Sequence, residues 1–132
     1  MSNTSKGNLI EIEVKNILER LGWMVFRQHR KPMFMKGRMI TAGADIFGCD
    51  MVAKKEGQKS LWIQVSTKSH KSDKLKQIMK FPWTYEFETA QIWLRTSGER
   101  SFEIYEAPTF IYLGKRFTNG EYAPNTNLLK AI

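Results

Sequence analysis

Three polar side chains interrupt two apolar segments in the first half of the chain. Residues 43–53, GADIFGCDMVA, carry Asp45 and Asp50, and residues 61–68, LWIQVSTK, carry Gln64. The apolar and β-branched residues around them are typical of buried strands. Because burying an ionisable or amide group is costly unless it is paired, these side chains indicate a site with a specific chemical task.

The spacing of the two segments predicts which of these side chains meet. The sequence KKEGQKS lies between them and contains Gly57, a residue typical of turns, so strands over 50–54 and 61–66 can form a hairpin. A hairpin centred on Gly57 places Asp50 opposite Gln64, with both side chains on one face and their Cβ atoms roughly 5 Å apart. Asp45 then lies beyond the regular ladder, in the segment that leads into the first strand.

A helix predicted over residues 8–21 could bring a further carboxylate to this place. Its apolar residues recur at helical spacing, and Glu11 and Glu13 flank that stripe, one on each side. Together with Asp50 and Gln64, one such glutamate would complete an oxygen-only cluster, which suits Mg²⁺ or Mn²⁺. A solvated position on the helix flank is the alternative for either glutamate.

The remaining elements follow from local signals. We expect a strand over 23–28, a basic, Met-rich loop to about Gly43, a helix over 71–79, and strands over 90–95, 102–105 and 110–113. The chain reads as one domain, 1–132, in which 1–7 form a flexible tail and 114–132 a C-terminal extension with a turn at Asn119-Gly120. The order helix, three strands, helix, strand predicts an α/β fold with a mixed central sheet.

The charge balance favours a polyanionic partner. The 132 residues include 21 Lys and Arg against 13 Asp and Glu, a net charge of +8. Basic residues concentrate in segments 27–38 and 66–80, for which a purely solubilising surface is the alternative. The expected DNA-binding residues are Lys6, Arg27, Arg30, Lys36, Arg38, Ser66, Lys71, Lys74 and Lys76.

Other classes of protein receive little support. The single cysteine, Cys49, has no nearby histidine and is expected to be a small buried apolar side chain. His29 and His70 are isolated, so they do not suggest a zinc site. The chain has no run of about 18 apolar residues, which a membrane-spanning helix needs. We therefore expect a cytoplasmic protein.

The chain resembles the PD-(D/E)XK nuclease superfamily, and within it the small archaeal-type Holliday junction resolvases. The resemblance covers roughly residues 5–80 and rests on three short motifs: Lys6-Gly7-Asn8-Leu9-Ile10-Glu11, Asp50-Met51-Val52-Ala53 and Ile63-Gln64-Val65-Ser66. The DIFG segment ahead of Asp50, together with QVST, also looks like a set of small viral proteins of the same superfamily. In those proteins Ser or Thr likewise occupies the position of the family's lysine.

This resemblance implies a restriction-endonuclease-like αβββαβ core and metal-dependent hydrolysis of DNA. Glu11, Asp50 and Gln64 would bind Mg²⁺ or Mn²⁺ and take part in catalysis, and Asp45 would be a further ligand that offsets the neutral Gln64. Branched DNA such as a Holliday junction is one possible substrate, and a homodimer is one possible assembly. A viral protein of this kind would act in the host cytoplasm.

The family's lysine orients the attacking water and offsets charge on the phosphorus, and Ser66 cannot replace it. Lys68 is the first candidate for this role, because residues 64, 66 and 68 share one face of a continuing strand. Lys15, one turn after Glu11, is the second candidate. The third interpretation is that catalysis has been lost and the protein is a DNA-binding module of the same fold.

Overall fold

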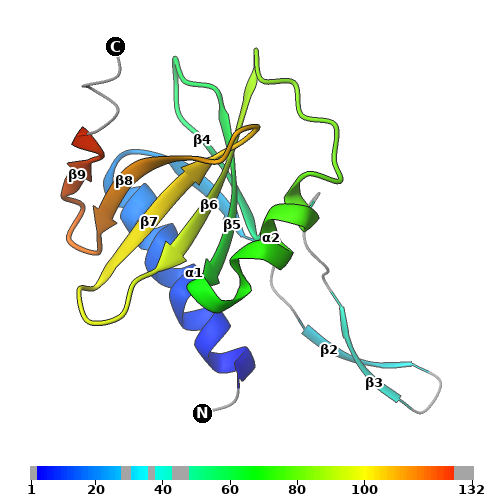
Figure 1. Ribbon diagram of the computed structural model, residues 1–132. Helices are drawn as coiled ribbons and strands as arrows, with labels where there is room; N and C mark the ends of the chain where they lie inside the picture. Colours follow the sequence, from blue (N-terminus) through cyan, green and yellow to red (C-terminus); the bar gives the residue numbers. More distant parts are fainter. Residues whose placement is uncertain (1–2, 28–30, 36–37, 43–47, 127–132) are drawn as a thin grey trace.

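The computed structural model describes residues 3–27, 31–35, 38–42 and 48–126, and it has the predicted α/β architecture with a mixed sheet. Its elements are α1 (Asn3–Arg20), β1 (Met24–Arg27), β2 (Lys31–Met35), β3 (Arg38–Ala42), β4 (Met51–Lys54), β5 (Ser60–Thr67), η1 (Lys68–His70), α2 (Lys71–Ile78), β6 (Glu88–Arg95), β7 (Ser101–Glu106), β8 (Ile111–Phe117) and β9 (Tyr122–Pro124). Seven strands form one sheet in the order β1-β4-β5-β6-β7-β8-β9 (Figure 1). Strands β2 and β3 form a separate two-stranded sheet.

The seven-stranded sheet contains one parallel pair. Strands β5 and β6 run parallel, and every other neighbouring pair is antiparallel. Parallel neighbours need a crossover connection rather than a tight turn. The segment with η1 and α2 is this crossover, which places α2 next to the polar end of β5.

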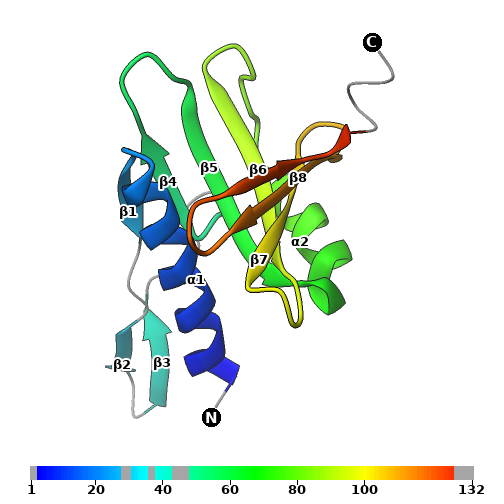
Figure 2. The same ribbon diagram turned by 90° about the vertical axis from the view of Figure 1, so that its left-hand side faces the viewer.

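Helix α1 covers one face of the sheet (Figure 2). Val14, Ile17 and Leu18 recur at the spacing of a single helix face, and they are buried against Met51 and Ile63. Full burial of an aliphatic side chain of this size contributes about 1.5–3 kcal/mol. This packing fixes the orientation of α1 over β4 and β5.

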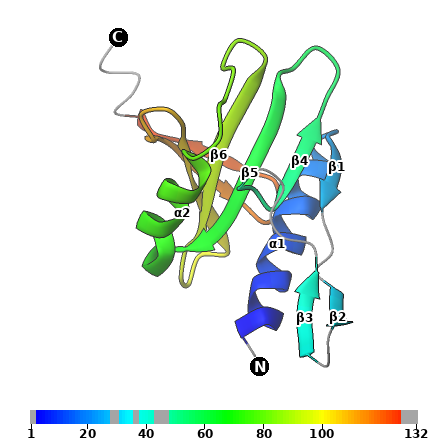
Figure 3. The ribbon, with the colours of Figure 1, turned by 90° about the vertical axis from the view of Figure 1, so that its right-hand side faces the viewer.

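Helix α2 lies on the opposite face (Figure 3). Its Ile78 is buried in a second cluster with Ile92, Leu94 and Cys49. The prediction that Cys49 is a small buried apolar side chain is confirmed. In the part of the chain that the structure describes, no helix is long and apolar enough to cross a membrane.

The predicted register of the central hairpin is also confirmed. Met51 pairs with Ile63, Val52 with Trp62 and Ala53 with Leu61, as expected for a hairpin centred on Gly57. The regular ladder ends at Met51, so Asp50 lies one residue beyond the last pair.

Three local predictions differ from the structure. The predicted loop up to Gly43 contains strands β2 and β3, where the β-forming residues Phe34, Ile40 and Thr41 outweigh the Met and Gly content. Helix α1 begins at Asn3 rather than at residue 8, so it includes most of the expected tail. Strand β9 adds to the sheet within the C-terminal extension, beyond the turn at Asn119-Gly120.

Candidate functional site

Asp50 lies where strand β4 begins and its regular pairing ends. Its backbone N–H donates to the carbonyl oxygen of Ile63 at 2.8 Å. Its carboxylate Oδ2 accepts a hydrogen bond from the backbone N–H of Val65 at 2.7 Å. At the end of the ladder the Val65 N–H therefore bonds to this carboxylate, where a regular antiparallel pair would supply a backbone carbonyl oxygen. This contact fixes the orientation of a side chain that is only 5% exposed.

Gln64 is fully buried in β5, on the face that α2 covers. When the amide oxygen and nitrogen are assigned so that both have hydrogen-bond partners, the side chain makes two contacts. Nε2 donates to the carbonyl oxygen of Gly48, and Oε1 accepts from the ammonium group of Lys74 at 2.8 Å. A buried amide with partners at both ends carries no desolvation penalty from unmade hydrogen bonds. Gln64 thus connects the segment before Asp50 with helix α2.

Gly48 allows this segment to approach α2 closely. Its φ is +76°, a conformation that side chains other than glycine rarely adopt. A Cβ atom there would lie 2.7 Å from Cε2 of Phe81 and 2.9 Å from the carbonyl oxygen of Gln77. A larger residue would therefore push Asp50 and its neighbours away from the end of α2.

The two glutamates of α1 have different partners. Glu11 is buried, and its Oε1 lies 3.2 Å from Nε of Arg27 at the end of β1. Glu13 is half-buried, and its Oε2 lies 3.4 Å from Nη2 of Arg95. Glu11, rather than Glu13, is therefore the helix carboxylate that lies in the interior, and Arg27 neutralises its charge.

The Glu11–Arg27 ion pair and Asp50 lie at the same end of the sheet. Arg27 pairs with Met51 across β1 and β4, and Met51 directly follows Asp50. Glu11 approaches this end from the α1 face, whereas Gln64 lies on the α2 face. The structure thus brings Asp50 and Gln64 together through the Gly48–Asp50 segment and holds Glu11 on the other side of the sheet.

The two lysines proposed to replace the family's lysine have partners elsewhere. Lys68 is 61% exposed, and its Nζ lies 3.1 Å from Oε1 of Glu103. Lys15 lies on the surface of α1 with its Nζ 3.2 Å from Oε1 of Glu19. Lys74 is the lysine whose ammonium group reaches the Gln64 side chain.

Lys71, one turn before Lys74 on α2, also packs against the sheet. Its ammonium group lies 3.8 Å from the ring centroid of Tyr105, in cation–π geometry. The Tyr105 hydroxyl donates to Oε2 of Glu103 at 3.3 Å. Burial raises the pKa of Tyr105, and the negative charge of Glu103 raises it further. Of the three α2 lysines expected to bind DNA, Lys76 is exposed, whereas Lys71 and Lys74 are half-buried.

Some of the expected site residues lie outside the part of the chain that the structure describes. Asp45, Arg30 and Lys36 lie outside the residues that the structure describes, as do the side chains of Lys6 and Arg38. Arg27, expected on the DNA-binding surface, instead has its guanidinium group in the ion pair with Glu11.

The described residues offer a limited donor set for a metal ion. Among them, no three Asp, Glu, His or Cys side chains form a group that could hold a cation. The available oxygen donors are the Asp50 carboxylate, the Gln64 amide and the Glu11 carboxylate, which are of the type that Mg²⁺ prefers. Gln64 contacts the cationic side chain of Lys74, and Glu11 contacts that of Arg27.

The role of Lys74 in the site was missed by reasoning from the sequence, although a signal for it exists. Lys71, Lys74, Leu75 and Ile78 recur at the spacing of one helix face, so the inward face of α2 carries two lysines beside its apolar residues. The sequence does not fix how that face is rotated relative to β5. The identity of the lysine nearest Gln64 therefore required the structure.

Comparison with known proteins adds no identification. No protein-family model matches the chain, and no curated protein sequence matches it.

Proposed function

We propose that this protein is a DNA endonuclease that hydrolyses phosphodiester bonds with a bound Mg²⁺ or Mn²⁺ ion, with branched DNA among its substrates. The observation that carries the proposal is the contact of Lys74 with Gln64, on the strand next to the buried Asp50. This arrangement combines the fixed carboxylate of Asp50 at the start of β4, the amide oxygen of Gln64 on β5 and the ammonium group of Lys74 on α2. The net charge of +8 fits a polyanionic substrate.

The proposal of a restriction-endonuclease-like core rests on the arrangement of six elements. In chain order, α1, β1, β4, β5, α2 and β6 supply three antiparallel strands, a crossover helix and a parallel strand. The resemblance implies the same αβββαβ order, with β2 and β3 as an insertion between the first two strands.

Each residue of the site has a proposed role. Asp50, held by the Val65 N–H, is the principal metal ligand, and the Gln64 oxygen is a weaker neutral donor beside it. A bound divalent cation would polarise the scissile phosphate and lower the pKa of its bound water. Lys74 offsets the negative charge that develops on the phosphate oxygens, the role that a lysine at position 66 would have. Lys74 replaces Lys68 in our proposal because Lys68 is paired with Glu103.

A second candidate function is a DNA-binding module of the same fold that does not cleave. Two observations favour it: Glu11 is neutralised by Arg27, and the Gln64 oxygen is occupied by Lys74. Such a module would keep the basic surface and the fold while lacking the affinity for a divalent cation.

Two measurements separate these functions. The protein is incubated with linear, single-stranded, flapped and four-way DNA, with and without Mg²⁺ or Mn²⁺, and the products are resolved on a denaturing gel. An endonuclease gives metal-dependent products from at least one substrate. Calorimetric titration with Mn²⁺ provides the second readout, in which the non-catalytic module shows no binding. DNA binding without cleavage and without Mn²⁺ binding would reject the endonuclease.

A further inference from the structure

Strands β2 and β3 form a hairpin that is separate from the main sheet. They pair antiparallel from Lys31 with Ala42 to Met35 with Arg38, and neither belongs to the seven-stranded sheet. In all three views the pair extends away from the main sheet (Figures 1, 2 and 3). We refer to the paired strands β2 and β3 as the β-ribbon.

The topology places the β-ribbon at the same end of the sheet as the candidate site. The chain leaves the sheet after Arg27 and returns ahead of Asp50, and Arg27 is paired with Met51. The turn between β4 and β5, residues 55–59, lies at the opposite end of these strands. A macromolecule bound along the β-ribbon would therefore reach the end of the sheet that carries Asp50.

The composition of the β-ribbon suits a polyanion. The two strands carry Lys31 and Arg38 and no acidic residue, and Lys36 lies between them in the sequence. A two-stranded hairpin that is not part of a larger sheet is only marginally stable by itself in water. Neutralisation of these positive charges by phosphates on a bound partner would favour the ordered hairpin.

The shape of the β-ribbon selects among nucleic acids. The major groove of B-form DNA is about 12 Å wide and about 8.5 Å deep, and it admits a two-stranded β-ribbon. A five-residue strand extends about 17 Å, which is long enough to cross that depth. The major groove of A-form RNA is deep and narrow, so the same ribbon would not enter it.

We propose that the β-ribbon enters the major groove of duplex DNA and positions the duplex beside the candidate site. This inference rests on the proposed function for its DNA substrate, and it adds the duplex form of that substrate and the element that recognises it. Cleavage then takes place within or next to a double-stranded segment, including the duplex arms of a branched molecule.

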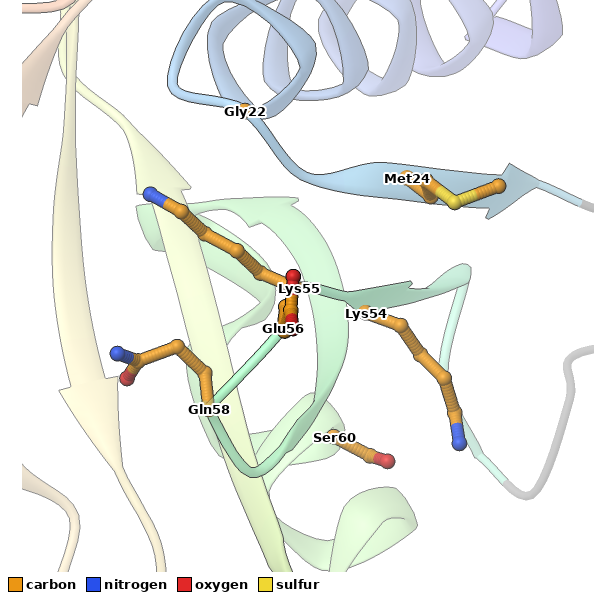
Figure 4. Close-up of a pocket in the computed structure, with 7 residues that line it drawn as sticks. All are labelled: Gly22, Met24, Lys54, Lys55, Glu56, Gln58 and Ser60. Atoms are coloured by element: carbon orange, nitrogen blue, oxygen red, sulfur yellow. The ribbon is translucent and has the colours of Figure 1, made fainter.

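A matched pair of variants tests the β-ribbon. Lys31→Ala/Arg38→Ala removes two charges from it. Lys54→Ala/Lys55→Ala removes two charges from the opposite end of the sheet, where both lysines line an open pocket of about 400 Å³ (Figure 4). Affinity for a duplex DNA oligonucleotide, a duplex RNA and a single-stranded DNA is measured by fluorescence anisotropy over a series of salt concentrations, without divalent cations. Circular dichroism and urea unfolding verify that each variant is folded.

We expect the β-ribbon variant to bind duplex DNA at least ten-fold more weakly at low salt. The slope of log K against log salt should fall by about 1.8, since each phosphate contact contributes about 0.9. The preference of the wild type for duplex DNA over duplex RNA should decrease in this variant, and the Lys54/Lys55 variant should retain wild-type values. Equal losses in the two variants, no loss in the β-ribbon variant, or no duplex binding by the wild type would each overturn the inference. Because these measurements need no cleavage, a wild type that binds duplex DNA through the β-ribbon but does not hydrolyse it would reject only the proposed endonuclease.

Discussion

With the Gln64 amide oriented so that both of its ends have partners, the ammonium group of Lys74 lies 2.8 Å from its side-chain oxygen, and this contact joins helix α2 to the centre of strand β5. It places a positive charge beside a buried position of β5, the strand whose Val65 N–H donates to the carboxylate of Asp50. The contact should therefore affect both the stability of the fold, measured by unfolding, and the proposed chemistry, measured by the rate of DNA cleavage.

Lys74→Met removes the charge while keeping most of the apolar stem. We expect the rate of metal-dependent DNA cleavage to fall by about 10²–10³, the typical loss when one group that stabilises the transition state is removed. Because the Gln64 oxygen loses its partner, the free energy of unfolding should also fall, by about 1–3 kcal/mol.

Two further lysine variants serve as controls for that result. Lys76→Met changes an exposed lysine of the same helix, and Lys68→Ala removes the lysine that is paired with Glu103. Both should retain cleavage within a few-fold of the wild type. A loss for Lys68→Ala as large as that for Lys74→Met would return the role to Lys68.

Gly48→Ala tests the close approach of the segment before Asp50 to α2. A left-handed backbone conformation in a residue other than glycine costs about 1–3 kcal/mol, and here the new Cβ would also lie 2.7 Å from the Phe81 ring. Gly57→Ala is the matched control, since Gly57 has a φ of +79° and no atom within 4 Å of the added Cβ. Urea unfolding should show a larger loss of stability for Gly48→Ala. Equal losses would show that backbone conformation alone matters at position 48.

The buried ion pair of Glu11 and Arg27 makes a prediction about stability. Glu11→Ala leaves the Arg27 guanidinium group in the interior without this carboxylate and should reduce the free energy of unfolding by about 3–5 kcal/mol. The double variant Glu11→Leu/Arg27→Met replaces both charges with apolar groups and should recover most of that loss. Urea unfolding of the single and double variants checks this, and an equally unstable double variant would show that the pair acts through other contacts.

The parts of the fold that the sequence predicts depend on local patterns. The register of β4 and β5 follows from the turn around Gly57 together with the alternation of Met51, Ala53, Leu61 and Ile63, and it is confirmed. Helix α2 and strand β6 follow from similarly local signals. The sequence does not predict the hairpin of β2 and β3, because the segment is basic and rich in Met and contains a glycine, and no apolar alternation marks a buried face.

The candidate site is less predictable because it depends on how elements pack together. The sequence indicates Asp50 and Gln64 from their unusual position in apolar strands, and both are buried. It does not indicate that Asp50 would bond to the Val65 backbone one residue beyond the ladder. Nor does it indicate that Arg27 would neutralise Glu11, since that contact depends on how α1 lies across β1.

The most direct test of the endonuclease is the comparison of the wild type with Asp50→Asn. Both proteins are incubated with linear and four-way DNA in Mn²⁺, and their DNA affinities are measured in parallel without metal. The asparagine is of nearly the same size and can still accept the Val65 hydrogen bond, so the fold should be preserved. We predict metal-dependent cleavage by the wild type, none by Asp50→Asn, and equal or slightly tighter DNA binding by the variant because a negative charge has been removed. Cleavage by Asp50→Asn at the wild-type rate, or no cleavage by the wild type on any DNA, would contradict the proposed function.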